Sequence, residues 1–295
     1  MTNRTNWPAP TCSTQHPVDF DIFWNTCQAS LAPDDLHETE EFSSPQAAFC
    51  RLILQNGEDV LCARLLRPAT PTSVLIDFHD IGRSARGHYY LSRYLPAGCA
   101  VLAPELPADA AVCCGAPDPQ TPGGVPVLLR TYKAALRALR AARQLFPHLP
   151  VAVSGEGLGG AMALLCAAQS DAVTVCTVLN PLLLDLRTMA GAGAGGYYQP
   201  LTNWFRAQNP TRSRQEELFC ALDHLDCMNF APPSSCAFLL GSSRMDPLSP
   251  AAAQLALFQH STSTDKRQIL FDKYTHERVN WYEDAQLEFL LQHLA

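Results

Sequence analysis

The chain has 295 residues, a formal net charge of −7, 47% hydrophobic residues and 17% charged residues. This share of apolar side chains supports a sizeable core and argues against an intrinsically disordered chain. An acidic chain without a basic stripe gives no reason to expect a nucleic acid partner. No apolar run approaches the roughly 20 residues that cross a bilayer, so we expect no membrane partner either.

The start of the chain and its cysteines both favour a reducing compartment. Residues 1–10 are polar and lack the basic head and apolar run of a signal peptide. The 12 cysteines include no Cys-x-x-Cys pair. Five of them lie in apolar segments, where a free thiol packs as a small hydrophobe: Cys62, Cys99, Cys166, Cys176 and Cys236. We therefore expect a cytoplasmic protein with no metal site and no cofactor.

Short apolar runs alternate with helical patterns along most of the chain. The first helix begins near Asp19, with Phe20, Phe23 and Trp24 spaced to share one buried face. Strands are expected at residues 60–66, 74–79, 100–103, 151–154, 173–179, 237–241 and 268–271, and further helices at 128–146, 159–169, 251–259 and 281–293. Almost continuously apolar strands separated by helices predict a three-layer α/β fold, with a mostly parallel sheet covered on both faces.

Two segments interrupt this alternation. Residues 107–126 are rich in Pro, Gly, Ala and Cys and predict a loop at the rim. Residues 189–230 form a long insertion that opens with glycines and is expected to be helical later, as a cap. The predicted organisation is one domain over residues 1–295, with an N-terminal helical extension at 1–45 and the insertion at 189–230.

The most informative segment follows the strand at 151–154. Gly155-Glu156-Gly157-Leu158-Gly159 stands between that strand and the next helix. The spacing is that of the nucleophile elbow Gly-x-Ser-x-Gly of α/β-hydrolases, with Gly157 in place of the serine. Glycine has no side chain that could attack a carbonyl. Ser154 is not a substitute, because it precedes the turn that lifts the nucleophile.

The other two members of a Ser-His-Asp system stand where this fold requires them. Asp246 follows the strand at 237–241, and His276 follows the strand at 268–271. The acid and the histidine come after the nucleophile in the chain order of α/β-hydrolases. We expect Asp246 and His276 to form a pair beside the elbow, with the backbone amide of Leu158 as an oxyanion donor.

These motifs together resemble carbohydrate esterase family 7, the acetyl xylan esterases and cephalosporin-C deacetylases. The resemblance runs nearly end to end and implies an α/β-hydrolase fold and a deacetylase ancestry. It also implies a small acylated sugar or ester as ligand, and it makes a homo-oligomer plausible. The segments that carry it are residues 17–20 with 23–24, 203–206, 225–230, 246–247 and 276–277.

The departures from the family pattern all fall at its reactive site. Gly157 replaces the serine, and none of the family's Arg-Gly-Gln motif is kept at residues 105–107. The family's oxyanion tyrosine, shortly after a His-Gly pair, falls at Ile81 after His79-Asp80, and we expect that Ile81 cannot donate a hydrogen bond there. A laboratory serine-to-glycine change would explain Gly157 alone. We therefore expect an esterase-like protein with impaired or absent catalysis, which keeps a ligand, serves in assembly, or has diverged without either.

Two alternatives stay open on the sequence. One is an active deacetylase that uses a non-standard group. The other is a dinucleotide-binding protein, because Gly155, Gly157 and Gly160 also fit Gly-x-Gly-x-x-Gly after a strand. That motif requires an acidic residue about 20 positions on, at the end of the next strand. The next strand ends before Asn180 and Pro181, with no carboxylate until Asp185, which favours the esterase interpretation.

Overall fold

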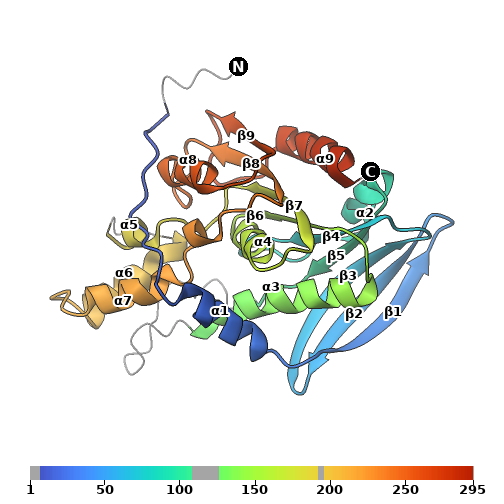
Figure 1. Ribbon diagram of the computed structural model, residues 1–295, viewed down its shortest axis with the longest axis horizontal. Coiled ribbons are helices and arrows are strands. Elements are labelled where there is room, and N and C mark those ends of the chain that lie inside the picture. The colour runs from blue at the N-terminus through green and yellow to red at the C-terminus, as the bar shows by residue number, and fades with distance from the viewer. Residues whose placement is uncertain (1–6, 108–125, 192–195, 295) are drawn as a thin grey trace.

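Within the part of the chain that the structure describes, nine strands pair into one sheet in the order β1-β2-β3-β5-β4-β6-β7-β8-β9 (Figure 1). The structure, a computed structural model, describes residues 7–107, 126–191 and 196–294. The strands are β1 (Asp35–Ser43), β2 (Ala47–Asn56), β3 (Asp59–Pro68), β4 (Ser73–Phe78), β5 (Cys99–Pro104), β6 (Val151–Glu156), β7 (Val173–Leu179), β8 (Ala237–Ser243) and β9 (Lys266–Phe271).

The sheet divides into an antiparallel and a parallel part. Strands β1, β2, β3 and β5 pair antiparallel, whereas β5, β4, β6, β7, β8 and β9 run parallel to one another. The carboxyl ends of parallel strands lie at one edge of a sheet, which is where ligand and catalytic sites of open α/β folds gather. The loops after β4, β6, β8 and β9 therefore meet there.

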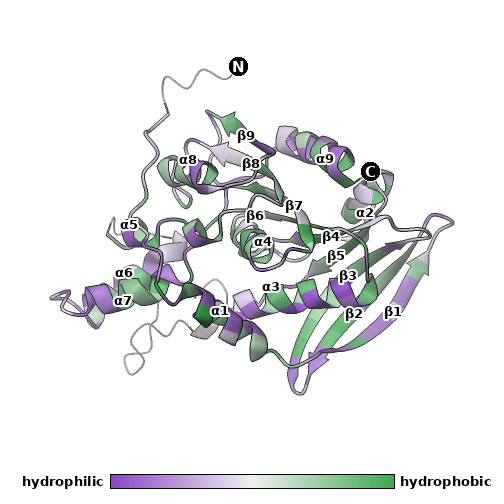
Figure 2. Cartoon of the chain, in the orientation of Figure 1, coloured by the Kyte–Doolittle hydropathy of each residue, from purple (hydrophilic) through white to green (hydrophobic). Residues whose placement is uncertain are grey.

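Helices cover both faces of the sheet, so the predicted three-layer α/β-hydrolase fold is confirmed. Core residues of α1, α3, α4 and α8 pack on one face, and those of α2, η2 and α9 pack on the other. Figure 2 shows α4 as a mainly hydrophobic helix, which fits its burial against the sheet. The helices and 3-10 turns are α1 (Phe20–Ala29), α2 (His88–Leu91), η2 (Ser92–Ala97), α3 (Pro126–Leu145), α4 (Leu158–Ala168), α5 (Leu186–Gly191), η4 (Gly196–Tyr198), α6 (Gln199–Ala207), α7 (Gln215–Asp223), η5 (Cys227–Phe230), α8 (Ala251–His260) and α9 (Asn280–Leu294).

Helix α1 buries the face that its sequence predicts. Phe20 is 4% exposed and Trp24 is 0% exposed, and Phe23 packs against the same core. The rings of Trp24 and Phe230 lie 5.2 Å apart. The indole N–H of Trp24 donates to the carbonyl of His224 at 3.0 Å. Helix α1 is therefore fixed to the segment that follows α7.

The N-terminal extension is only partly helical, in contrast to the expectation for residues 1–45. Residues 35–43 form strand β1, which pairs with β2 along the edge of the sheet. Almost every residue of β1 is exposed, so no apolar alternation marks it as a strand. Its backbone hydrogen bonds to β2 decide its structure, and its acidic side chains suit an edge strand that must not pair further.

The structure describes only part of the two segments that interrupt the alternation, residues 107–126 and 189–230. Of the predicted insertion, α6, α7 and the turns η4 and η5 follow α5, so the part described is helical. Residues 192–195 of its glycine run lie outside the described residues, and so do residues 108–125 of the expected loop. Asp226, which is 0% exposed, accepts hydrogen bonds from the amides of Asp185 and Leu186 and from the hydroxyl of Thr14. These contacts join the insertion to the N-terminal segment.

The described residues contain no group of three metal-ligating side chains that could hold an ion. Their helices include none that is both long and apolar enough to cross a bilayer. Cys99, Cys166, Cys176 and Cys236 are buried free thiols, but Cys62 is exposed because it lies on the outward side of β3.

Candidate functional site

Gly157 lies at the sharp turn between β6 and α4. Its backbone has φ 55° and ψ −118°, a conformation that residues with a Cβ adopt only under strain. A Cβ on the neighbouring Gly159 would lie 2.2 Å from the carbonyl oxygen of Phe78, so that glycine is required for close packing against β4. The segment therefore has the backbone of a nucleophile elbow, with no side chain at its tip.

His276 and Asp246 form a close pair at the same sheet edge. His276 Nδ1 lies 2.6 Å from Oδ2 of Asp246, whose side chain is 0% exposed. The other carboxylate oxygen of Asp246 accepts from the amides of Leu248 at 2.8 Å and Ser249 at 3.0 Å. These bonds fix the carboxylate, which in turn fixes the imidazole ring. The arrangement has the geometry of the acid-histidine half of a Ser-His-Asp system.

Asn180, directly after β7, ties together the loops that carry this pair. Its side-chain oxygen accepts from the amide of Ser243 at 2.8 Å, and its side-chain nitrogen donates to the carbonyl of Thr275 at 3.3 Å. Ser243 ends the strand before Asp246, and Thr275 precedes His276. Asn180 therefore positions the acid and the histidine relative to each other.

The place in front of the elbow is occupied by the side chain of Asp80, from the loop after β4. A Cβ atom built on Gly157 would lie 1.8 Å from Oδ1 of Asp80. The other oxygen, Oδ2, lies 3.2 Å from Nε2 of His276. Asp80 is 8% exposed. The imidazole nitrogen that would face a catalytic hydroxyl therefore faces a carboxylate.

Two backbone amides donate to Asp80 at the corner that Gly157, Asp80 and His276 form, and they belong to the two residues expected at the oxyanion position. The amides of Leu158 and Ile81 lie 2.9 Å and 2.7 Å from its Oδ1. Ile81 donates through its backbone N–H, so the expectation that it cannot donate a hydrogen bond here is wrong. Sequence comparison of side chains alone does not detect such a backbone donor.

Two carboxylates set the protonation of His276. Burial opposes the charged form of the ring, but the hydrogen bonds and charges of Asp246 and Asp80 outweigh it and raise the pKa of His276 to about 9. The geometry agrees, because each ring nitrogen has an ionisable acceptor and only the imidazolium donates from both. Near pH 7 the ring therefore carries a proton on each nitrogen.

His79 holds the backbone of the Asp80 loop. Its Nδ1–H donates to the carbonyl of Asp80 at 2.8 Å, and its Nε2 accepts from the amide of Leu106 at 2.9 Å. This pattern requires the neutral ring, and burial lowers the pKa of His79 accordingly. Glu105, which falls at the family's Arg-Gly-Gln position, accepts from the amide of Ala85 at 3.0 Å. The loop is thereby fixed at two points.

Ser154 lies away from this chemistry. It is buried, its hydroxyl donates to Asp77 at 3.1 Å, and it accepts from the side chain of Gln286 at 2.6 Å. Neither His276 nor Asp246 contacts it. The structure thus places Ser154 in a buried polar network below the sheet edge.

Little space remains at the corner. The cavity in front of Gly157 measures about 10 Å³, close to the minimum that holds one water molecule. Its lining includes Asp80, Arg83, Glu156, His276 and Arg278, and among the described residues none comes from the insertion. A pyrophosphate does not fit there, and the Leu158 amide that would receive it already binds Asp80.

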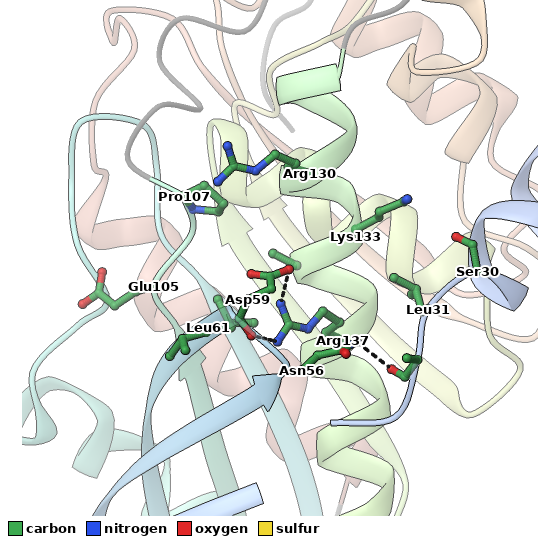
Figure 3. A pocket seen from close by; sticks show the side chains of 13 residues that line it. Ser30, Leu31, Asn56, Asp59, Leu61, Glu105, Pro107, Arg130, Lys133 and Arg137 are labelled. Atoms are coloured by element: carbon green, nitrogen blue, oxygen red, sulfur yellow. Dashed lines mark hydrogen bonds and ion pairs between the residues drawn. The ribbon is translucent and has the colours of Figure 1, made fainter. Parts of the chain in front are cut away.

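A second cavity, of about 460 Å³, lies beside the N-terminal half of α3 (Figure 3). Its most buried charge, Arg137, is bound to Asp34 at 2.6 Å and to Asp59 at 3.0 Å, and it donates to the carbonyl of Leu54. These contacts join α3 to β2 and to the segment after α1. Arg137 therefore has a packing role, and the cavity contains none of the groups of the elbow.

Comparisons with known proteins agree with this fold. The family model described as acetyl xylan esterase (AXE1) matches residues 129–293, more than half of the chain. The fold is similar to acetyl xylan esterase 1 from Thermoanaerobacterium sp. JW/SL YS485, with a TM-score of 0.83, 23% identity and 97% of each chain covered. It is also similar to the acetyl xylan esterase from Paenibacillus sp. R4, with a TM-score of 0.79, 20% identity and 97% of each chain covered. No curated protein sequence matches.

Proposed function

Because the chain belongs to the acetyl xylan esterase (AXE1) family, we propose that it is an esterase-like α/β-hydrolase that does not hydrolyse esters. One observation carries the proposal: Nε2 of His276 faces the carboxylate of Asp80, and the elbow residue Gly157 offers no hydroxyl. An ester needs a nucleophile whose proton the histidine accepts. Neither the nucleophile nor a free acceptor nitrogen is available in this corner.

The protonation of His276 is a second obstacle to hydrolysis. With a pKa raised to about 9 by Asp246 and Asp80, against the effect of burial, the ring holds its proton near pH 7. A general base works best when its pKa lies near the working pH and its lone pair is free. Loss of the nucleophile alone lowers a serine hydrolase rate on the order of a million-fold in the subtilisin comparison.

The family's ligand class is an acylated sugar or ester, and retention of such a ligand is one role the fold could keep. The cavity of about 10 Å³ at the corner speaks against an acetylated sugar seated there while Asp80 holds its position. A ligand at this edge therefore requires Asp80 to move. A role in assembly as a homo-oligomer stays a prediction, which light scattering on purified protein tests directly.

The experiment for the proposal is hydrolysis of p-nitrophenyl acetate and of acetylated xylan by the purified chain. We expect rates at background, and we expect the His276→Ala variant to match the unmodified protein. Turnover by the unmodified protein that disappears in His276→Ala would contradict the proposal. It would favour the alternative of an active deacetylase that uses a non-standard group.

A further inference from the structure

The carboxylate of Asp80 has the contacts of a bound acyl group rather than those of a surface residue. Its Oδ1 accepts two backbone hydrogen bonds, from Leu158 at 2.9 Å and from Ile81 at 2.7 Å. In an esterase, a pair of amides placed in this way stabilises the oxygen on which negative charge develops. Here the amides are satisfied by the protein itself.

Charge explains why this position suits a carboxylate. The amide of Leu158 is the first of α4, an 11-residue helix whose N-terminus favours negative charge. Nε2 of His276 donates to Oδ2 of Asp80 at 3.2 Å, and His276 is itself held by Asp246. Charge-assisted hydrogen bonds of this kind are roughly twice as strong as neutral ones. Asp80 therefore has three donors, two of them fixed in the backbone.

Gly157 is the condition for this arrangement. A Cβ on Gly157 would meet three atoms of the Asp80 carboxyl group, at 1.8, 2.3 and 2.8 Å. At Gly155 and Gly159, by contrast, the nearest atoms to an added Cβ belong to the backbone. The clash at Gly157 is therefore with one side chain, and removing that side chain removes it.

We propose that Asp80 is an intramolecular ligand of the oxyanion donors, which closes an otherwise assembled esterase corner by occupying the place of a bound acyl group. The inference rests on the proposed function, and it assigns the blockage of the site to the Asp80 carboxylate. With Asp80 removed, the Leu158 and Ile81 amides and His276 form a site for a small monocarboxylate such as acetate. With a serine also restored at position 157, the same corner has every group that ester hydrolysis needs.

The first test compares four proteins in p-nitrophenyl acetate hydrolysis: the unmodified chain, Asp80→Gly, Gly157→Ser and the double variant. We expect background rates from the first three and a rate at least about 100-fold higher from the double variant, which falls to background when His276→Ala is added. The inference is overturned if Gly157→Ser alone equals the double variant, or if the folded double variant stays at background. His276-dependent turnover by the unmodified chain is a separate result, which would overturn the proposed function instead.

The second test needs no restored activity and applies if the double variant does not fold. Sodium acetate is titrated into the unmodified protein and into Asp80→Gly, and the imidazole resonances of His276 are followed by NMR. We expect saturable shifts at millimolar acetate in Asp80→Gly only. The matched control is Asp265→Ala, because Asp265 also faces a histidine nitrogen, Nε2 of His293 at 2.9 Å, but on the surface. Equal responses in the unmodified protein and Asp80→Gly, or no response in either, would refute the inference.

Discussion

The Nδ1 atom of His276 lies 2.6 Å from Oδ2 of Asp246, a carboxylate whose side chain is fully shielded from solvent. The pair survives in a chain whose elbow has no hydroxyl to activate. Its present effect is on charge, because Asp246 and Asp80 together hold a proton on His276. The free energy of unfolding should therefore fall as the pH rises and this proton is lost.

The pKa of His276 is raised in the folded state, from 6.5 to about 9. Its contribution to stability is therefore fully present below pH 6.5 and is lost as the pH rises through 9. The loss is on the order of 3 kcal/mol, because each pKa unit corresponds to about 1.4 kcal/mol. Urea unfolding of the unmodified protein between pH 6 and 10 should show this decline, and the His276→Gln variant should show less of it. His293→Gln is the control, because the His293 ring faces the exposed carboxylate of Asp265. A slope equal in all three proteins would contradict the prediction.

An alanine at position 157 should destabilise the protein through contact with Asp80. Gly157→Ala is expected to lower the free energy of unfolding by about 1–3 kcal/mol more than Gly82→Ala does. Gly82 is the matched control, since its φ is also positive, at 66°, but nothing lies within 4 Å of an added Cβ. Repeating Gly157→Ala in the Asp80→Gly background should recover most of the difference in urea unfolding. If Gly157→Ala lowers the free energy of unfolding equally in the Asp80→Gly background, the effect comes from backbone strain and not from contact with Asp80.

Substitution of Arg137 should lower the free energy of unfolding more than substitution of most other charged residues. Its side chain is 5% exposed, and its partner Asp34 is 7% exposed. Arg137→Ala leaves a buried carboxylate without its main partner, and the expected loss of unfolding free energy is about 3–5 kcal/mol. Arg51→Ala is the comparison, because the Arg51–Glu41 pair is exposed and should contribute less than about 1 kcal/mol. Similar losses for the two variants in chemical denaturation would count against this assignment.

Replacement of Asn180 should both lower the free energy of unfolding and change the position of His276. Asn180→Ala removes acceptance from the Ser243 amide and donation to the Thr275 carbonyl, and we expect a loss of about 1–3 kcal/mol. The NMR resonances of His276 should shift as well, because both loops lose a common anchor. Asn203→Ala is the control, since its exposed side chain accepts a hydrogen bond from the exposed Gln199 at 2.9 Å. Unchanged His276 resonances would show that Asn180 is not a positioning residue.

The sequence is sufficient to predict the parallel part of the sheet. Its inner strands are buried on both faces and therefore appear as short apolar runs, so β6, β7 and β8 lie where the pattern places them. The positions of Asp246 and His276 follow from the order of those strands. Strand β1 could not be predicted in this way, because its residues are exposed and it forms a strand by pairing with β2.

Asp80 could not be assigned from pattern alone, since its role depends on where a loop side chain points. A signal was nevertheless present in the comparison of motifs. The family's His-Gly pair is His79-Asp80 here, and the family's elbow serine is Gly157. Relative to the family pattern, position 80 therefore gains a side chain and position 157 loses one. In the folded chain the two positions share one volume, which no sequence pattern reveals.

That shared volume couples the two positions in any further change of this chain. The aspartate cannot keep its present rotamer while a Cβ stands at residue 157. A side chain at residue 157 and the present placement of the Asp80 carboxylate therefore exclude each other, so a substitution at either residue alters the conformations open to the other.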